Sequence, residues 1–504
     1  MKSLFVVVLC FVISTTTAVN KEGCGEVERG RGRVTGAWGM EEVKQKVEKL
    51  DSFNIVDYGA VGDGITLNTQ AIQKAIDNAN EHQDGGIVLV ESGFYLSGAL
   101  EMKSNVFLQV TGDAVLLASH NSDDYPGPWD DTDGMPVFLS SNGAKNIGII
   151  GDGRLDGQAI PFFVGGFNQS EDKYIPITWA GQYGCQGECR PRLVQFIESE
   201  NILVHGITLQ NSPDWTSHYI NCTNILIEGV TIYGDYRWPN NDGIDPNSSQ
   251  NITITHTRID VGDDNICPKT SYGALKNFLV TDCHLKSRSS GIKFGSTSQG
   301  DFYDALFERI WIHNSGRGIS IQHRDVGNVW NIEFRDIVID GVSYQPESWW
   351  GVGEAIWVTS IPRDEGHPMG TVSDVRYVNV SGRAENGALF SSRTDTPLSG
   401  FYLCDVNIDI QPWHPKFGRR IDFLPPEHDY RPTNVIPDAR VLCDTDGIYF
   451  ENVVNTTVYN SSITFASPRQ SWWGACTNSN SSYPYDVEFD KFQCINGEDN
   501  EMEL

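Results

Sequence analysis

Two acidic clusters lie close together near the middle of the chain. Asp242 comes first, and Asp263 and Asp264 follow twenty-one and twenty-two residues later, each cluster set among Gly, Asn and Pro. Carboxyl groups that share one site repel each other when ionised, so at least one should have a raised pKa. A raised pKa lets one carboxyl act as a general acid while its neighbour acts as a base. Such chemistry requires a fold that brings the two clusters together.

A repeat of 23 to 27 residues surrounds these clusters. Each copy begins with Asn or Asp followed by alternating apolar residues, and copies start at positions 201, 224, 251, 277, 304 and 331. Val, Ile and Thr dominate the copies, and Gly, Asn, Asp and Ser separate them, which indicates short strands and turns. Self-similarity at this period is typical of a solenoid. We therefore predict an all-β fold, a right-handed parallel β-helix with coils about 4.8 Å apart.

The interval between the acidic clusters is about one coil of this solenoid. Asp242 should therefore stack on Asp263 and Asp264 on one face of successive coils. Turn chemistry is the simpler interpretation of Asp245, because Asp in a solenoid turn commonly bonds local backbone. Adjacent carboxylates at Asp263 and Asp264 are harder to explain as turn residues, since their repulsion favours a function.

An amphipathic helix is expected near the start of the repeats, where it would cover the N-terminal end of the coil stack. Thr66 or Asn68 is placed to cap it. The predicted organisation is a signal peptide at 1–18, an N-terminal extension at 19–50, and a single parallel β-helix catalytic domain at 51–504, with 430–504 as terminal coils or a cap.

The first eighteen residues predict export. Lys2 precedes a short apolar core and a small-residue cleavage site, the pattern of a secretory signal. Removing Cys10 leaves ten cysteines, an even number that suits disulfides in an oxidising compartment. We expect a secreted glycoprotein of the extracellular space or cell wall, because the chain has glycosylation sequons at Asn168, Asn221, Asn247, Asn251, Asn379, Asn455, Asn460 and Asn480.

Charge narrows the range of partners. The formal net charge of −29 argues against nucleic acid and anionic membrane, although local cations could still hold an anionic substrate. Cys185 and Cys189 have no second Cys/His pair of suitable spacing, so a zinc site is not expected. No cofactor is expected, and we expect a monomer.

The acidic clusters and their surroundings resemble polygalacturonase-type glycoside hydrolases of family 28, in the pectin-lyase-like superfamily. NNDGID at 240 matches the Asn-Thr-Asp block with Asn241 for Thr, and GDDNI at 262 matches the paired-Asp block. The likeness covers roughly residues 50–345. It implies an inverting hydrolase that cleaves α-glycosidic bonds of galacturonic-acid-containing pectic polysaccharide. By position, Asp263 would be the general acid, Asp242 and Asp264 would hold and deprotonate the attacking water, and no metal or organic cofactor would take part.

One altered block lies beside the acidic clusters. Where the family has Gly-His-Gly, this chain reads SSGIKFGS, with Ser290 in the His position. Ser290 could donate a weaker hydrogen bond, or Lys293 could supply the charge. The alternative for Lys293 is an ordinary solvated surface lysine.

The second altered block is the Arg-Ile-Lys block that grips the substrate carboxylate. RGISIQHRD places Ser320 and Gln322 at its Arg and Lys positions. Strand alternation puts both on the same side as Arg324, which could supply the missing cation, with His323 nearby. The alternative for Arg324 is a salt bridge to Asp325 or to an acid of a neighbouring coil.

Trp215 and His218 are further candidates for substrate binding. An aromatic ring could form a sugar platform beside the groove, whereas core or loop packing is the commoner role of tryptophan. The altered blocks also leave other functions open: a rhamnogalacturonan or exo-acting pectic hydrolase, a lyase that uses calcium and an Arg or Lys base, or a catalytically silent β-helix that binds cell-wall glycan.

Overall fold

The computed structural model describes residues 39–126, 134–168, 173–176, 190–343, 351–413, 419–423, 440–496 and 500–503, together with Cys24 and Gly36. Val34–Leu504 form one compact unit. The predicted signal peptide and the Cys185 and Cys189 pair lie outside the described residues. Among those described, no helix has the length and apolar character needed to cross a membrane.

The largest sheet of the described chain, here called sheet I, has 24 strands, and its neighbours pair in parallel except β38 with β39. Its strands are β1 (Ser52–Asn54), β2 (Asp63–Leu67), β3 (Gly86–Glu91), β4 (Phe94–Ser97), β6 (Val106–Thr111), β7 (Val115–Ala118), β9 (Lys145–Ile150), β10 (Arg154–Asp156), β14 (Glu200–His205), β15 (Thr208–Gln210), β17 (Thr223–Glu228), β18 (Thr231–Tyr233), β20 (Gln250–Thr255), β21 (Arg258–Val261), β22 (Leu275–Ser287), β24 (Phe302–Ser315), β26 (Val329–Gly341), β28 (Ser373–Ala384), β30 (Leu398–Ile410), β34 (Val453–Tyr459), β35 (Ser462–Phe465), β37 (Tyr485–Asp490), β38 (Gln493–Asn496) and β39 (Asn500–Glu503).

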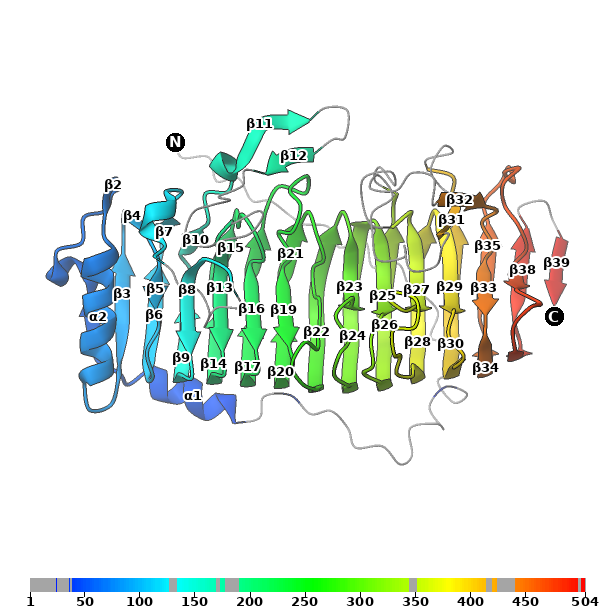
Figure 1. Cartoon of the computed structure of the whole chain (residues 1–504), viewed down its shortest axis with the longest axis horizontal. Coiled ribbons are helices and arrows are strands. Elements are labelled where there is room, and N and C mark those ends of the chain that lie inside the picture. Colours follow the sequence, from blue (N-terminus) through cyan, green and yellow to red (C-terminus); the bar gives the residue numbers. More distant parts are fainter. Residues whose placement is uncertain are drawn as a thin grey trace, which may run out of the picture. The chain divides into compact units, whose positions relative to one another are not determined.

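A second parallel sheet, sheet II, runs alongside in two ladders that bridges through Ile266 join. The first ladder contains β5 (Leu100–Glu101), β8 (Val137–Asn142), β13 (Arg192–Ile197), β16 (Ser217–Ile220) and β19 (Ile244–Asn247). The second contains β23 (Ser290–Gly295), β25 (Arg317–His323), β27 (Glu354–Ser360), β29 (Asn386–Ser392), β33 (Ile448–Glu451) and β36 (Thr477–Ser479). Successive coils follow one another along the stack (Figure 1), so the fold is the predicted right-handed parallel β-helix.

Two antiparallel hairpins project from this body. They are β11 (Phe163–Asn168) with β12 (Lys173–Pro176), and β31 (Arg420–Phe423) with β32 (Arg440–Cys443).

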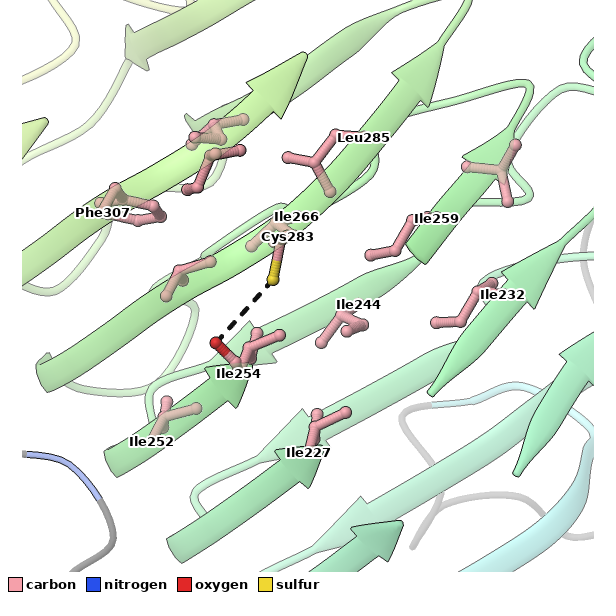
Figure 2. Close-up of a cluster of buried hydrophobic side chains, with 14 of the residues drawn as sticks. Ile227, Ile232, Ile244, Ile252, Ile254, Ile259, Ile266, Cys283, Leu285 and Phe307 are labelled. Carbon is pink, nitrogen blue, oxygen red and sulfur yellow. Dashed lines mark hydrogen bonds between the residues drawn. The ribbon is translucent and has the colours of Figure 1, made fainter. Parts of the chain in front are cut away.

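The repeated apolar positions form the interior. Ile225, Ile252 and Phe278 are register partners on consecutive coils of sheet I, and all are buried. Figure 2 shows side chains of several strands meeting in this interior, where Cys283 Sγ donates to the carbonyl of Ile254. Burial of these methyl-rich side chains stabilises the stack, at about 25 cal/mol for each Å² of apolar surface removed from water.

The Asn that opens each repeat has a structural role. Asn224, Asn251 and Asn277 adopt left-handed φ between 53° and 59°, a region that Asn tolerates better than most residues. The Nδ2 of Asn251 donates to Oδ1 of Asn224 at 2.9 Å, and Asn277 donates to Asn251 at 2.9 Å. An asparagine ladder therefore joins these consecutive coils at the edge where the chain turns, and it explains the Asn that opens these repeats.

Two α-helices belong to the described fold, beside short 3-10 helices at Ile55–Tyr58, Ser122–Asp124 and Ile160–Phe162. The predicted capping helix is α2 (Thr69–Glu81), which packs against β1 and β3 through Ile72, Ala75 and Ile76 at the N-terminal end of the stack (Figure 1). Asn68 lies at its N-cap, but the Asn68 side chain makes no capping bond and instead binds the backbone of Val61. A shorter helix, α1 (Met40–Val47), covers the outer face of sheet I.

Cysteine usage is mixed. Cys476 and Cys494 form a disulfide, which agrees with the prediction of disulfides. Cys222, Cys267 and Cys283 are buried free thiols; Cys222 and Cys283 lie in the apolar core, and Cys267 lies beside the acidic clusters.

Candidate active site

Asp242 and Asp264 occupy equivalent positions on neighbouring coils. Ile244 bridges to Ile266, and the N–H of Gly243 donates to the carbonyl of Asp264 at 2.9 Å. Carboxylate oxygens of Asp242 and Asp264 lie within 4.8 Å of one another. The one-coil spacing that the sequence predicted therefore brings the two acidic clusters together where the two ladders of sheet II meet.

Asp263 is held by backbone donors. Its Oδ2 accepts from the N–H of Asn240 at 3.0 Å, and its Oδ1 accepts from the N–H of Asp264 at 3.0 Å. Burial and then the charge of Asp264 raise the pKa of Asp263 to about 6. A carboxyl with this pKa carries a proton under mildly acidic conditions and can give it up.

Asp264 has the opposite electrostatic setting. Its Oδ1 accepts from Ser289 Oγ at 2.7 Å and from the N–H of Ser290 at 3.2 Å, and Lys293 Nζ lies 2.7 Å from Oδ2. Burial alone would raise the pKa of Asp264, but the charges of Lys293 and Lys269 outweigh it and lower the pKa. Asp264 is therefore ionised where Asp263 is still protonated.

Asp242 differs from both. Burial, followed by the charges of Asp245 and Asp263, raises the pKa of Asp242 well above its ordinary value. Its Oδ1 is buried and makes no hydrogen bond within the described residues. The cluster thus contains an ionised carboxylate at Asp264, a carboxyl at Asp263 that titrates near pH 6, and a carboxyl at Asp242 that favours its neutral form.

Asp245 and Lys269 also belong to this cluster. The turn interpretation of Asp245 is wrong, because Asp245 lies within β19, is fully buried, and approaches Lys269 Nζ at 2.8 Å. Lys269 Nζ also lies 3.7 Å from Asp242 Oδ2. Lys269 could have been predicted from the sequence. Four nearby carboxyls need a buried cation, and Lys269 follows the paired Asp block by five residues.

The altered His block supplies a direct contact with this cluster. Lys293 is 7% exposed and binds Asp264, so it is not a solvated surface lysine. Ser290 is fully buried, its backbone N–H binds Asp264, and its Oγ makes no hydrogen bond with any described residue. Lys293 thus places a cation against Asp264, while Ser290 Oγ has no partner among the described residues, and whether either replaces the family His stays a prediction.

Trp215 and His218 lie on the coil that precedes Asp242 and Asp245, on the side away from Asp263 and Asp264. His218 pairs in register with Asp245 across β16 and β19. Cations lie over the Trp215 ring, with the Arg192 guanidinium at 4.2 Å and Lys269 Nζ at 4.7 Å. The ring of His218 meets Trp215 edge-on at 4.9 Å, and burial lowers the pKa of His218 well below its usual value. Neutral His218 and half-buried Trp215 therefore line the cluster.

The altered Arg-Ile-Lys block lies farther along sheet II. Ile319 and Ile321 of β25 point into the interior of the coil. Ser320 and Gln322 therefore point away from that interior, as strand alternation predicts, although both are buried. The five residues from Ser320 to Arg324 are all at least 99% buried.

The residues at the end of β25 form polar contacts with neighbouring segments. His323 Nδ1 binds Ser360 Oγ at 2.9 Å, its Nε2 binds the Gly327 carbonyl at 2.6 Å, and burial lowers its pKa to about 4. Asp325, considered above as a partner for Arg324, binds Arg363 at 2.7 Å. Arg324 itself follows the strand and is fully buried, so a part for Arg324 or His323 in substrate binding stays a prediction.

Related structures share this architecture. The chain aligns with a hyperthermoactive exopolygalacturonase of Thermotoga maritima at a TM-score of 0.59 and 22% identity, covering 92% of this chain and 97% of that one. It aligns with a polygalacturonase of Erwinia carotovora ssp. carotovora at a TM-score of 0.57 and 21% identity, covering 76% of this chain and 96% of that one. At these identities the likeness establishes the fold.

Relatives by sequence give the family. A protein of Vitis vinifera named "Probable polygalacturonase" is 32% identical over 328 residues, which are 62% of this chain and 63% of that protein, so the match spans less than two thirds of its length. An endo-polygalacturonase of Pectobacterium carotovorum subsp. carotovorum is 25% identical over 331 residues, covering 63% of this chain and 78% of that protein. Residues 88–412 match the family described as "Glycosyl hydrolases family 28". Since that match covers more than half of the chain, the protein belongs to glycosyl hydrolase family 28.

Proposed function

We propose that the protein is a secreted glycoside hydrolase that cleaves α-glycosidic bonds of galacturonic-acid-containing pectic polysaccharide with inversion. One observation carries the proposal: two adjacent carboxyls, Asp263 and Asp264, are biased toward opposite protonation states within a single buried cluster. Hydrolysis of a glycosidic bond needs such a pair, an acid for the leaving oxygen and a base for water. Membership of family 28 and the polygalacturonases among the relatives support a pectic substrate.

The reaction is a single displacement. As the C1–O bond breaks, Asp263 gives its proton to the departing glycosidic oxygen. Water attacks C1 from the opposite face, forms the new C–O bond, and loses its proton to Asp264. Neutral Asp242, with Oδ1 unbonded to the described residues, orients that water. One water is consumed, and proton exchange with solvent restores Asp263 and Asp264.

Several features of substrate and setting belong to the same proposal. Cations must meet the uronate carboxylates, and Arg324 is our candidate, with Gln322, His323, Ser290, Trp215 and His218 as neighbouring contacts. We place the protein in the extracellular space or cell wall, where it acts as a monomer on polysaccharide and on neither nucleic acid nor membrane. Because the Arg-Ile-Lys block is altered, rhamnogalacturonan and exo-acting cleavage are the variants of substrate and mode to compare.

The decisive experiment measures products from homogalacturonan and rhamnogalacturonan with wild type, Asp263→Asn and Asp260→Asn. Asp260 is the matched control, because it pairs with Lys286 on sheet I, away from the cluster. We expect wild type and Asp260→Asn to release reducing ends and Asp263→Asn to lose roughly 10²- to 10⁴-fold in rate with its fold intact. Proton NMR of the first product should show the β-anomer.

Three outcomes would overturn the proposal. An unsaturated uronate product that disappears with a chelator would indicate a lyase. Retention of the anomeric configuration would exclude the single displacement. An absence of hydrolysis by wild type on both polymers, together with glycan binding that Asp263→Asn leaves unchanged, would indicate a silent binding protein.

A further inference from the structure

Lys269 performs no step in the proposed reaction, yet it lies at the centre of the acidic cluster. Its Nζ is 2.8 Å from Asp245 Oδ1 and 3.7 Å from Asp242 Oδ2, and the residue is 7% exposed. A lysine this deeply buried is rare unless it is paired. Its partners are Asp242, which orients water in the proposed reaction and lies just before β19, and Asp245, which lies within β19.

The remaining contacts of Lys269 hold its ammonium group in place. Cys267 Sγ accepts from Nζ at 2.7 Å, and the ring of Trp215 lies 4.7 Å from Nζ. Trp215 is itself covered by Arg192 at 4.2 Å, and Arg192 lies 3.1 Å from His218 Nδ1. A cation set over an aromatic ring and beside a carboxylate has little freedom to move.

We propose that Lys269, held between Asp245 and the Trp215 ring, is a positioning residue that fixes the Asp242 carboxyl and balances the charge of the acidic cluster. The proposal deepens the proposed function and rests on it. It also gives Trp215 a part in orienting Lys269, in addition to any contact with sugar. Asp245 serves as the anchor, because its carboxylate is the closer of the two to the ammonium.

The charged and titratable groups around Lys269 come from every neighbouring element. Asp242 and Asp245 face it from β19 and the turn before it, Asp264 and Cys267 from its own loop, His218 from β16, and Lys293 from β23 through Asp264. Lys269 lowers the pKa of all four carboxyls, Asp242, Asp245, Asp263 and Asp264. Removal of its charge should therefore raise all four pKa values.

The test compares Lys269→Met, Lys269→Gln and Lys269→Arg with Lys276→Met. Lys276 is the matched control, because it also lies over an aromatic ring, Tyr303 at 5.9 Å, but on sheet I. We expect both limbs of the kcat/KM profile of the Met and Gln variants to move to higher pH. We also expect kcat to fall on the order of a hundredfold with a smaller change in KM. Arginine should restore most of kcat, and Lys276→Met should match wild type.

An unshifted pH profile in both neutral variants, or an equal change in Lys276→Met, would overturn the inference. A readout without substrate separates it from the proposed function: the melting temperature measured from pH 4 to pH 8. In Lys269→Met the pKa values of Asp242, Asp245 and Asp263 should rise further, and the lowered pKa of Asp264 should rise as well. The variant should therefore lose more stability than wild type as pH rises, because its folded state keeps more protons than that of wild type at the same pH. A parallel pair of curves would contradict the charge role whether or not wild type hydrolyses pectin, whereas an inactive wild type would contradict only the proposed function.

Discussion

Replacing Lys293 by Met tests the electrostatic description of the site most directly. Lys293 Nζ lies 2.7 Å from Asp264 Oδ2, and their side chains are 9% and 2% exposed. Removal of one partner from a buried ion pair typically costs about 3–5 kcal/mol, because the remaining charge is left without its counter-ion. Ser289 Oγ and the N–H of Ser290 still bind Asp264, which places the expected loss near the lower end, at about 3 kcal/mol.

The loss should depend on pH with a definite sign. In wild type the pKa of Asp264 is lowered, so its contribution to stability is present above the unfolded value and is lost as pH falls. Without Lys293, the pKa of Asp264 is higher than in wild type, so the variant keeps less of this stabilisation as pH rises. The difference in stability between the two proteins should therefore be small near pH 4 and largest near neutrality.

Urea unfolding at pH 4 and pH 7, followed by near-UV circular dichroism, gives the measurement. Midpoints are the quantity to compare, because a solenoid need not unfold in two states. The control is Lys286→Met, whose ion pair with Asp260 has side chains 29% and 16% exposed and should contribute only about 0–1 kcal/mol. Equal losses at the two pH values, or a loss no larger than that of Lys286→Met, would refute the reasoning.

Two further predictions concern catalysis and the fold. The kcat/KM of wild type should fall above a pH of about 6, where Asp263 loses its proton, and fall again at low pH, where Asp264 gains one; a rate still rising at pH 8 would contradict this assignment of acid and base. Asn251→Ala should destabilise the protein by roughly 1–2 kcal/mol through loss of its two ladder hydrogen bonds, with Asn224 and Asn277, and through strain at positive φ, with KM unchanged. Asn407→Ala, at an exposed position outside the ladder, is its control in thermal unfolding, and an equal loss there would show that the ladder contributes nothing specific.

The sequence predicted the coil and the stacking of the acidic clusters because both depend on one quantity, the period of the repeat. It did not predict the partners of Asp245 and Lys269. Their contacts depend on which residue of one coil faces which residue of the next, and turns of variable length between β19 and β23 obscure that register. The same limit applies to Arg324. Alternation of side chains holds only within a strand, and β25 ends at His323. The pattern therefore does not predict the direction of the Arg324 side chain.

The stacking of coils along this solenoid determines how the chain can change in length. Each coil of the solenoid contacts only the coils before and after it. Whole coils added or removed beyond Glu354 would leave the acidic cluster undisturbed, since its carboxyls and lysines come from three consecutive coils between Asp242 and Lys293. A single residue inserted between Gly243 and Gly262 would instead shift Asp242 out of register with Asp263 and Asp264. Such a molecule can thus lengthen by whole coils, but not by single residues, without disrupting the acidic cluster.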